Sequence, residues 1–297
     1  MFTGTYTAIV TPFNTDGSVD YGCLRELMRQ QAEAGIAGVV PVGTTGESPT
    51  LTTEEHIEVV AKTVGYAVEF ASEYSAKRMT VIAGTGANST QEAVELTSAA
   101  REVGADATLQ ICPYYNKPTA EGLYRHFAAI ADLGLPVMLY NAPGRTSREI
   151  PIPVVARLAA HPKIVAIKEA AGDANRVNQI LAAAPSVAVI SGDDSLALPM
   201  MSIGATGLVS VASNIVPREM TEMINFALAG DFKAAFAIHE RYRGLFADLF
   251  IETNPVPVKA ALAMMGAMPE TYRLPLCEMD PANREKLRAT LRKLGLV

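Results

Sequence analysis

The sequence predicts an α/β protein, a (β/α)8 TIM barrel with a C-terminal helical domain. Short runs rich in valine and isoleucine alternate with longer amphipathic stretches, which is typical of repeated βα units and a parallel sheet. Polar and glycine-rich segments follow several of these runs directly, where a barrel places its active-site loops. Eight such units favour a closed barrel over a doubly wound open sheet.

The predicted elements follow one another in this order. The strands are residues 6–10, 38–42, 80–83, 107–111, 136–140, 164–168, 187–191 and 207–211. Between them, helices are predicted at 20–34, 53–73, 90–103, 120–132 and 174–183. After residue 216 the strand signal stops, and helices are predicted at 217–229, 232–250, 256–265 and 281–294. We therefore expect a catalytic barrel over residues 1–230 and a helical domain over residues 231–297.

Composition and charge narrow the classes of function. The chain has 297 residues, 49% of them hydrophobic, which is enough for one large core. Its net charge of -6 comes without basic blocks and without tryptophan, so a nucleic-acid surface is not expected. Residues 195–217 carry no charge, but prolines and glycines interrupt them, which indicates a short helix and a buried strand rather than a membrane span. The first residues lack a signal-peptide pattern, and a cytoplasmic protein is expected.

The cysteines and histidines suggest neither disulfides nor a metal site. Cys23, Cys112 and Cys277 are an odd number without a CxxC pair, which fits a reducing compartment, and we expect them in the core. The four histidines have no spacing typical of metal ligands. A Ser/His/Asp triad is disfavoured because the chain has no GxSxG motif.

Lys168 is the strongest single candidate for a catalytic residue. It closes the apolar run 164–167, so its amine is expected at the carboxyl end of a buried strand. Burial favours the neutral amine, which is the form that attacks carbonyls, and arginine cannot be tuned in this way. The functional interpretation is a Schiff-base lysine. A strand-end lysine that simply reaches solvent is the alternative.

Polar segments after other strands supply the groups that such a lysine needs. They are 43–47 (GTTGE), 113–118 (PYYNKP), 140–145 (YNAPGR) and 191–194 (SGDD). Threonine hydroxyls and backbone N–H groups can hold a carboxylate, tyrosines can relay protons, and arginine can clamp a second carboxylate. Each segment also has a structural interpretation, respectively a tight turn, packed phenols, an ion pair and a helix cap. Together they outline a site for a small keto acid that needs no cofactor, because a protonated imine is itself the electron sink.

With these residues the chain resembles the pyruvate-dependent class I aldolases, the family that includes dihydrodipicolinate synthase and N-acetylneuraminate lyase. The resemblance spans nearly the whole chain. It rests on the motifs GTTGE at 43–47, YNxPxR at 140–145, IKE at 167–169 and SGD at 191–193. The paired threonines, segment 113–118, the Arg-Thr pair at 145–146 and NPVPVK at 254–259 favour the synthase branch. The resemblance implies condensation of pyruvate with L-aspartate 4-semialdehyde through a lysine Schiff base, which opens the diaminopimelate and lysine pathway.

The resemblance also implies a role for each matching residue. Lys168 is then the nucleophile, Tyr140 passes protons to and from the imine, and Thr44 completes a hydroxyl relay with Tyr115 of a neighbouring subunit. The substrate-binding residues are Thr45 for the pyruvate carboxylate, Arg145 for the semialdehyde carboxylate, and Gly192 and Val209 as pocket lining. A homotetramer built as a dimer of dimers is the implied assembly.

Inhibition by L-lysine is a further implication. The positions that match a lysine site in relatives are Ser48, Pro49, Thr53, His56, Asn88, Glu92 and Tyr114. Pro49 and Thr53 depart from the residues of some lysine-sensitive relatives, and Glu92 has the alternative of simply facing solvent in the first turns of a helix. Two other functions stay open: a sibling aldolase acting on a sugar acid such as 2-keto-3-deoxygluconate or N-acetylneuraminate, and a non-catalytic barrel that binds keto acids.

Overall fold

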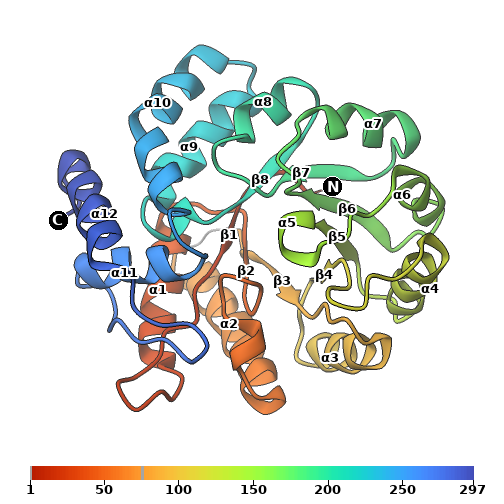
Figure 1. Cartoon of the computed structure of the whole chain (residues 1–297), viewed down its shortest axis with the longest axis horizontal. Coiled ribbons are helices and arrows are strands. Elements are labelled where there is room, and N and C mark those ends of the chain that lie inside the picture. Colours follow the sequence, from red (N-terminus) through yellow and green to blue (C-terminus); the bar gives the residue numbers. More distant parts are fainter. Residues whose placement is uncertain (1, 75–76) are drawn as a thin grey trace.

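The computed structural model describes residues 2–74 and 77–297, and its strands form one barrel. Eight parallel strands are paired in chain order, and β8 closes the barrel by pairing with β1 (Figure 1). The strands are β1 Gly4–Ala8, β2 Gly38–Val40, β3 Thr80–Gly84, β4 Ala107–Ile111, β5 Val137–Asn141, β6 Ile164–Glu169, β7 Ala188–Ser191 and β8 Gly207–Ser210. The predicted barrel is confirmed, and each predicted strand overlaps an observed one.

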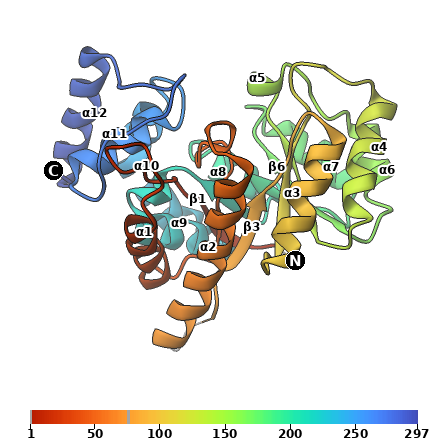
Figure 2. The ribbon, with the colours of Figure 1, turned by 90° about the horizontal axis from the view of Figure 1, so that it is seen from below.

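Helices surround the barrel (Figures 1 and 2). Between strands lie α1 Tyr21–Glu33, α2 Thr53–Glu73, α3 Thr90–Glu102, α4 Ala120–Ala131, α5 Pro143–Thr146, α6 Ile152–Leu158, α7 Asn175–Ala183 and α8 Ala197–Ser202, with a 3-10 turn, η1, at Ser48–Thr50. After β8 come a second 3-10 turn, η2 Ala212–Asn214, and the helices α9 Pro217–Leu228, α10 Phe232–Asp248, α11 Val256–Met264 and α12 Pro281–Leu294. Side chains fix several helix starts: Asp20 caps α1, and Thr52 with Glu55 forms a capping box at α2. No helix in the described part of the chain is long and apolar enough to cross a membrane.

Two short helices after β5 are absent from the sequence prediction. The helix α5 begins at Pro143, and α6 follows Pro151 and contains Pro153 in its first turn. Prolines in this region indicate loops when only the sequence is considered. A first-turn proline loses no hydrogen bond, however, because the first N–H groups of a helix have no intrahelical partner. The expectation for residues 195–217 is confirmed, since α8 and β8 are the short helix and the buried strand.

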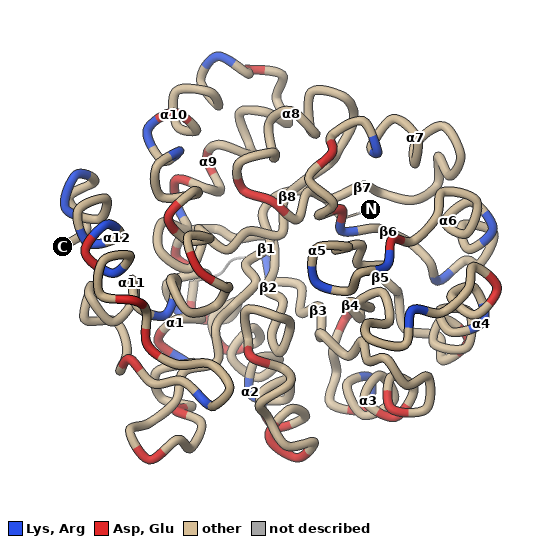
Figure 3. The backbone as a smooth tube through the Cα atoms, viewed as in Figure 1, with Lys and Arg blue, Asp and Glu red and all other residues tan. Residues whose placement is uncertain are grey.

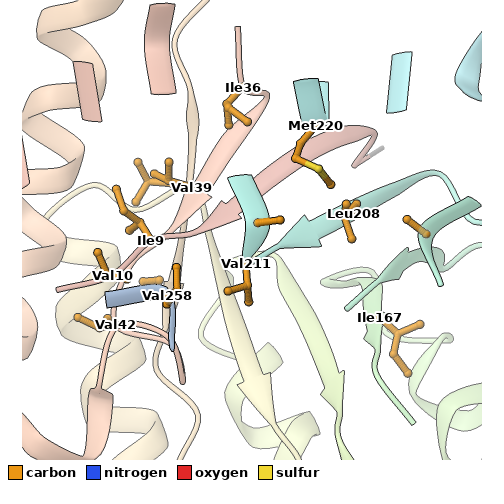
Figure 4. Close-up of a cluster of buried hydrophobic side chains, with 14 of the residues drawn as sticks. Ile9, Val10, Ile36, Val39, Val42, Ile167, Leu208, Val211, Met220 and Val258 are labelled. Carbon is orange, nitrogen blue, oxygen red and sulfur yellow. The ribbon is translucent and has the colours of Figure 1, made fainter. Parts of the chain in front are cut away.

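Apolar layers lie on both sides of the sheet. Side chains that include Tyr6, Ile82 and Met138 fill the barrel interior. The alternate side chains, such as Ile167, pack outward against the helices (Figure 4). Full burial of one such aliphatic side chain stabilises the fold by about 1.5–3 kcal/mol. Because side chains alternate along a strand, Lys168 shares the interior face and Glu169 the helix-facing side.

Charged residues lie mainly at the surface, whereas the three cysteines differ in their burial. Figure 3 shows Lys, Arg, Asp and Glu mainly on the outer helices and loops, with both signs interspersed. The expectation that the cysteines lie in the core holds for Cys112, which is buried, whereas Cys23 is half-buried and Cys277 is exposed. The expectation is wrong for Cys277 because it lies in the irregular segment before α12, outside any packed element.

The helices after α9 are joined to the barrel by polar contacts as well as by packing. The helix α10 packs on α9, and α12 packs on α10 and α11. Lys259 of α11 forms a fully buried ion pair with Glu47, which follows β2. Arg273 pairs with Glu55 of α2. Residues 231–297 thus form ion pairs with barrel segments, through Lys259 and Arg273. Their division from the barrel as a separate helical domain stays a prediction.

Candidate active site

A cavity of about 370 Å³ opens at the carboxyl ends of the barrel strands. It is lined from β5, β6, the loops after β2 and β7, and segment 250–254. Figure 2 shows α5 at this end of the barrel and the amino terminus toward the other. A larger hollow of about 610 Å³ lies beside Phe2 and Tyr6, but its one lysine, Lys77, is exposed and lies before β3. The chemistry predicted from the sequence is therefore concentrated in the smaller cavity.

Lys168 lies in this cavity with 6% of its surface exposed. Its partner in the sheet register is Tyr140, and the Lys168 Nζ lies 4.3 Å from the centre of the Tyr140 ring. Gly192 on the next strand end leaves room for the lysine stem, because a Cβ there would lie 2.9 Å from Lys168 Cε and 2.8 Å from Ala170 Cβ. Any side chain at this position would displace the amine. The predicted association of Lys168, Tyr140 and Gly192 is thus present in the fold.

The loop after β2 brings two threonines to the same cavity. Thr45 is buried, and its Oγ1 accepts a hydrogen bond of 2.9 Å from Asn254 Nδ2. Thr44 lines both this cavity and an adjoining hollow of about 220 Å³. Below the threonines, the buried pair of Glu47 and Lys259 holds the loop against α11, and burial lowers the pKa of Lys259 although Glu47 opposes this shift. The motif at 254–259 contributes to the family resemblance, but a local sequence pattern does not show that it contacts Thr45. The bonded residues, Thr45 and Asn254, are 209 positions apart in the chain.

Arg145 and the two loop tyrosines take different positions. Arg145 is exposed at the rim of the cavity, and its Nη2 donates to the Asn254 carbonyl oxygen at 3.4 Å. Tyr115 does not line the cavity of its own chain: it is 90% exposed, with a left-handed backbone φ of 69°. Tyr114 is less exposed and lines the adjoining hollow. One chain therefore lacks the second phenol of the predicted relay.

Two valines lie at the end of β8. Val209 is buried in the barrel interior, and Val211 lines the cavity, so contact of Val209 with a bound substrate stays a prediction. Asp193 accepts from the Ser195 and Leu196 backbone N–H groups in the turn before α8, whereas α8 itself has no side-chain cap. Asp194 is different, since it accepts from the Ser210 Oγ of β8 and from the Val211 N–H just after that strand, and burial raises its pKa to about 6.

The positions predicted for lysine binding are only partly gathered. Ser48, Pro49 and Tyr114 line the adjoining hollow together with Thr44, Tyr140 and Arg145. His56 lies behind Ser48, with Nδ1 at 3.5 Å from the Ser48 Oγ, and burial lowers the pKa of His56 to about 4.

The other three positions are not in the lining of that hollow. Asn88 donates to the Tyr114 carbonyl oxygen at 3.3 Å. Burial and then the charge of Glu92 raise the pKa of Tyr114. Thr53 is exposed at the start of α2. In the described residues no three His, Cys, Asp or Glu side chains are arranged as metal ligands.

Comparison with known proteins shows the family to which the chain belongs. Residues 1–294 match the model of the Dihydrodipicolinate synthetase family. The chain belongs to this family. The 4-hydroxy-tetrahydrodipicolinate synthase of Hydrogenobaculum sp. is 49% identical over 299 aligned residues, which cover 100% of both chains. The crystal structure of dihydrodipicolinate synthase from Aquifex aeolicus is 47% identical with a TM-score of 0.95 and covers 99% of each chain.

Two further solved structures carry ligands. The chloride-inhibited dihydrodipicolinate synthase of Acinetobacter baumannii, complexed with pyruvate, is 44% identical with a TM-score of 0.94 over 100% of both chains. The enzyme from Cyanidioschyzon merolae with lysine bound is 41% identical with a TM-score of 0.94, over 100% of this chain and 99% of that one. These ligands belong to those proteins. They show which small molecules relatives of this fold accommodate.

Proposed function

We propose that this chain condenses pyruvate with L-aspartate 4-semialdehyde to give 4-hydroxy-tetrahydrodipicolinate, the first step of the diaminopimelate and lysine pathway. A curated relative with this activity in its name, the synthase of Hydrogenobaculum sp., is 49% identical to the chain, and the alignment covers both proteins in full. The observation that carries the chemistry is the buried amine of Lys168 at the base of a 370 Å³ cavity, over the ring of Tyr140.

Lys168 acts as the nucleophile. Its Nζ attacks the ketone carbon of pyruvate, water leaves, and a protonated imine forms. Loss of a proton from the methyl carbon gives the enamine, whose carbon then bonds the aldehyde carbon of the semialdehyde. Attack of the semialdehyde amino group on the imine carbon closes the ring and frees Lys168. Tyr140, beside the amine, passes protons at the imine nitrogen and at the leaving water.

Two carboxylates need separate partners in this reaction. Thr45 is buried and lines the same cavity as Lys168, so its hydroxyl and the nearby backbone N–H groups suit the pyruvate carboxylate. Arg145 lies at the rim, where its planar guanidinium suits the carboxylate of the incoming semialdehyde. Gly192 shapes the floor of the pyruvate pocket, with Val209 behind it in the barrel interior.

A second subunit completes the proton relay. Tyr115 is exposed and outside its own cavity, so we assign it to the site of a neighbouring subunit, where it joins Thr44. This arrangement requires at least a dimer, and we propose a tetramer made of two dimers. Mixing Tyr115→Phe with Lys168→Ala subunits tests it. Random pairing leaves one site without either substitution in each mixed dimer, so activity returns to about a quarter of the parent's; no recovery after subunit exchange would assign Tyr115 to its own chain.

Borohydride trapping tests the covalent step. Reduction in the presence of pyruvate should add the mass of the reduced pyruvyl group to the peptide that contains Lys168. An unmodified Lys168 in a protein that turns over would exclude the imine mechanism. A coupled assay with pyruvate and a panel of aldehydes separates the synthase from a sugar-acid aldolase, because only the synthase prefers L-aspartate 4-semialdehyde.

Feedback inhibition by L-lysine is the proposed regulation. The adjoining hollow contacts the active site through Thr44 and Tyr140, and Glu92 supplies a negative charge near Tyr114 for an ammonium group. Lysine should then inhibit partially without competing with pyruvate, and Glu92→Thr should remove inhibition while leaving the uninhibited rate nearly unchanged. Absence of lysine binding at millimolar concentration by calorimetry, in an active preparation, would refute this site.

We propose that the protein is located in the cytoplasm. The three free cysteines of the chain support this proposal, because thiols stay reduced in that compartment.

A further inference from the structure

A closed ring of hydrogen bonds lies directly behind the two reactive side chains. Asn141 and Glu169 follow Tyr140 and Lys168 on β5 and β6, and the two are paired in the sheet register. Both are fully buried on the helix-facing side. Asn141 Nδ2 donates to Glu169 Oε1 at 2.9 Å and to Oε2 at 3.0 Å. The strand ends that carry the amine and the phenol are thus bonded together through side chains as well as through the sheet.

Arg176 of α7 closes the ring. Its Nε donates to Glu169 Oε2 at 3.0 Å, and its Nη2 donates to the Ile150 carbonyl oxygen at 3.0 Å. The Ile150 N–H in turn donates to Asn141 Oδ1 at 2.9 Å. The Ala171 N–H donates to Glu169 Oε1 at 2.8 Å. Each side-chain polar atom of Asn141 and Glu169 has a partner inside the fold, so the ring has one arrangement and no free capacity for a ligand.

We propose that Glu169, with Asn141 and Arg176, is a positioning residue for the Lys168 and Tyr140 pair. The inference rests on the proposed function, in which those two side chains carry out the chemistry. None of the three ring residues lines the cavity, so they act only through the strands they hold. Covalent catalysis requires the amine, the carbonyl carbon and the proton donor in near-attack geometry, and a displacement of about 1 Å can lower a rate on the order of 100-fold.

Glu169→Gln is the informative substitution. It preserves the size of the side chain, but an amide has one acceptor oxygen where the carboxylate has two, and its NH2 group would face another donor on Asn141 or Arg176. The ring then opens or shifts. The matched control is Glu149→Gln, which removes the other carboxylate bound to Arg176. Glu149 is half exposed, pairs with Arg176 and does not line the cavity.

The measurement separates positioning from stability. Exhaustive borohydride trapping with pyruvate, read by mass, counts the subunits whose Lys168 forms the adduct. The kcat is then expressed per adduct-forming subunit, a quantity that loss of folded protein does not change. For Glu169→Gln we expect this kcat to fall roughly 10- to 100-fold, with slower trapping, while Glu149→Gln stays within about two-fold of the parent.

The outcomes separate this inference from the proposed function. A parent protein without an adduct on Lys168 refutes the proposed function. A parent with the adduct and a Glu169→Gln variant with parent-like kcat per adduct overturns only the positioning role, even if its unfolding midpoint is lower. Should Glu169→Gln fail to fold, Arg176→Lys replaces it, because one ammonium cannot make the three contacts of the guanidinium. We expect about ten-fold lower kcat per adduct for that variant, and a parent-like value overturns the inference.

Discussion

Neighbouring residues at the ends of β5 and β6 have opposite roles. Tyr140 and Lys168 face the barrel interior and line the cavity. Asn141 and Glu169 face away from the barrel interior, and their side chains bond to other groups of the protein. Because side chains alternate along a strand, one step separates a reactive face from an anchoring face. The comparison teaches that a buried polar side chain can react where it keeps free hydrogen-bonding capacity. It acts as an anchor where partners in the fold use all of that capacity.

The largest expected effect is on the reactive face. Lys168→Ala removes the lysine that lines the cavity and forms the imine, so turnover should fall on the order of 1000-fold or more. Stability should change little, because the side chain lines the cavity and its loss leaves no buried charge without a partner. Steady-state kinetics and thermal unfolding of the same sample measure both effects. Substantial residual turnover, without contamination by parent enzyme, would contradict the assignment.

Substitutions on the anchoring face should lower the stability of the fold as well as the rate. Arg176→Met leaves the fully buried carboxylate of Glu169 without its cation, which should destabilise the fold by about 3–5 kcal/mol. Denaturant unfolding measures this loss. The control is Arg125→Met, which breaks an exposed pair with Glu121 and should leave the midpoint almost unchanged. Equal effects of the two substitutions would remove the distinction between the faces.

Local sequence patterns were sufficient for the barrel and for the place of Lys168 at a strand end. Periodicity locates the strands, and a strand end locates Lys168, since both signals lie within a few consecutive residues. The partners that hold these residues were beyond such patterns: Asn141 and Glu169 are 28 residues apart, and Thr45 and Asn254 are 209 apart. A strand pattern gives the face of a side chain but not its depth in the barrel, so it does not show that Val209 is buried in the barrel interior.

Arg145 sharpens the comparison within the cavity itself. Arg145→Ala should lower kcat/KM for the semialdehyde by about 2–4 kcal/mol in transition-state free energy, because a charge-assisted contact with one carboxylate is lost. The pyruvate adduct on Lys168 should still form, since Arg145 lies at the rim and not beside the amine. Kinetics with each substrate varied, together with borohydride trapping, separate the two steps. Loss of adduct formation would instead assign Arg145 to pyruvate.

His126 tests whether free capacity alone marks a functional group. It is buried in α4, its Nδ1 lies 2.9 Å from the Thr90 Oγ1, and its Nε2 has no partner in the part of the chain that the structure describes. It borders no cavity described above. Burial lowers the pKa of His126 to about 4, from an ordinary value of 6.5. We therefore expect this unpaired nitrogen to affect stability and not turnover.

The lowered pKa of His126 determines how the stability of the fold changes with pH. The folded protein holds the neutral ring and the unfolded chain accepts a proton more readily, so stability is fully present above pH 6.5 and is lost as pH falls toward 4. By pH 5 the loss should be about 2 kcal/mol. His126→Gln cannot titrate, so the stability difference between parent and variant should shrink by that amount from pH 7 to pH 5 in urea unfolding. A constant difference would mean that the folded protein protonates His126 as easily as the unfolded chain, and a matching loss of kcat would extend function to buried groups outside the cavity.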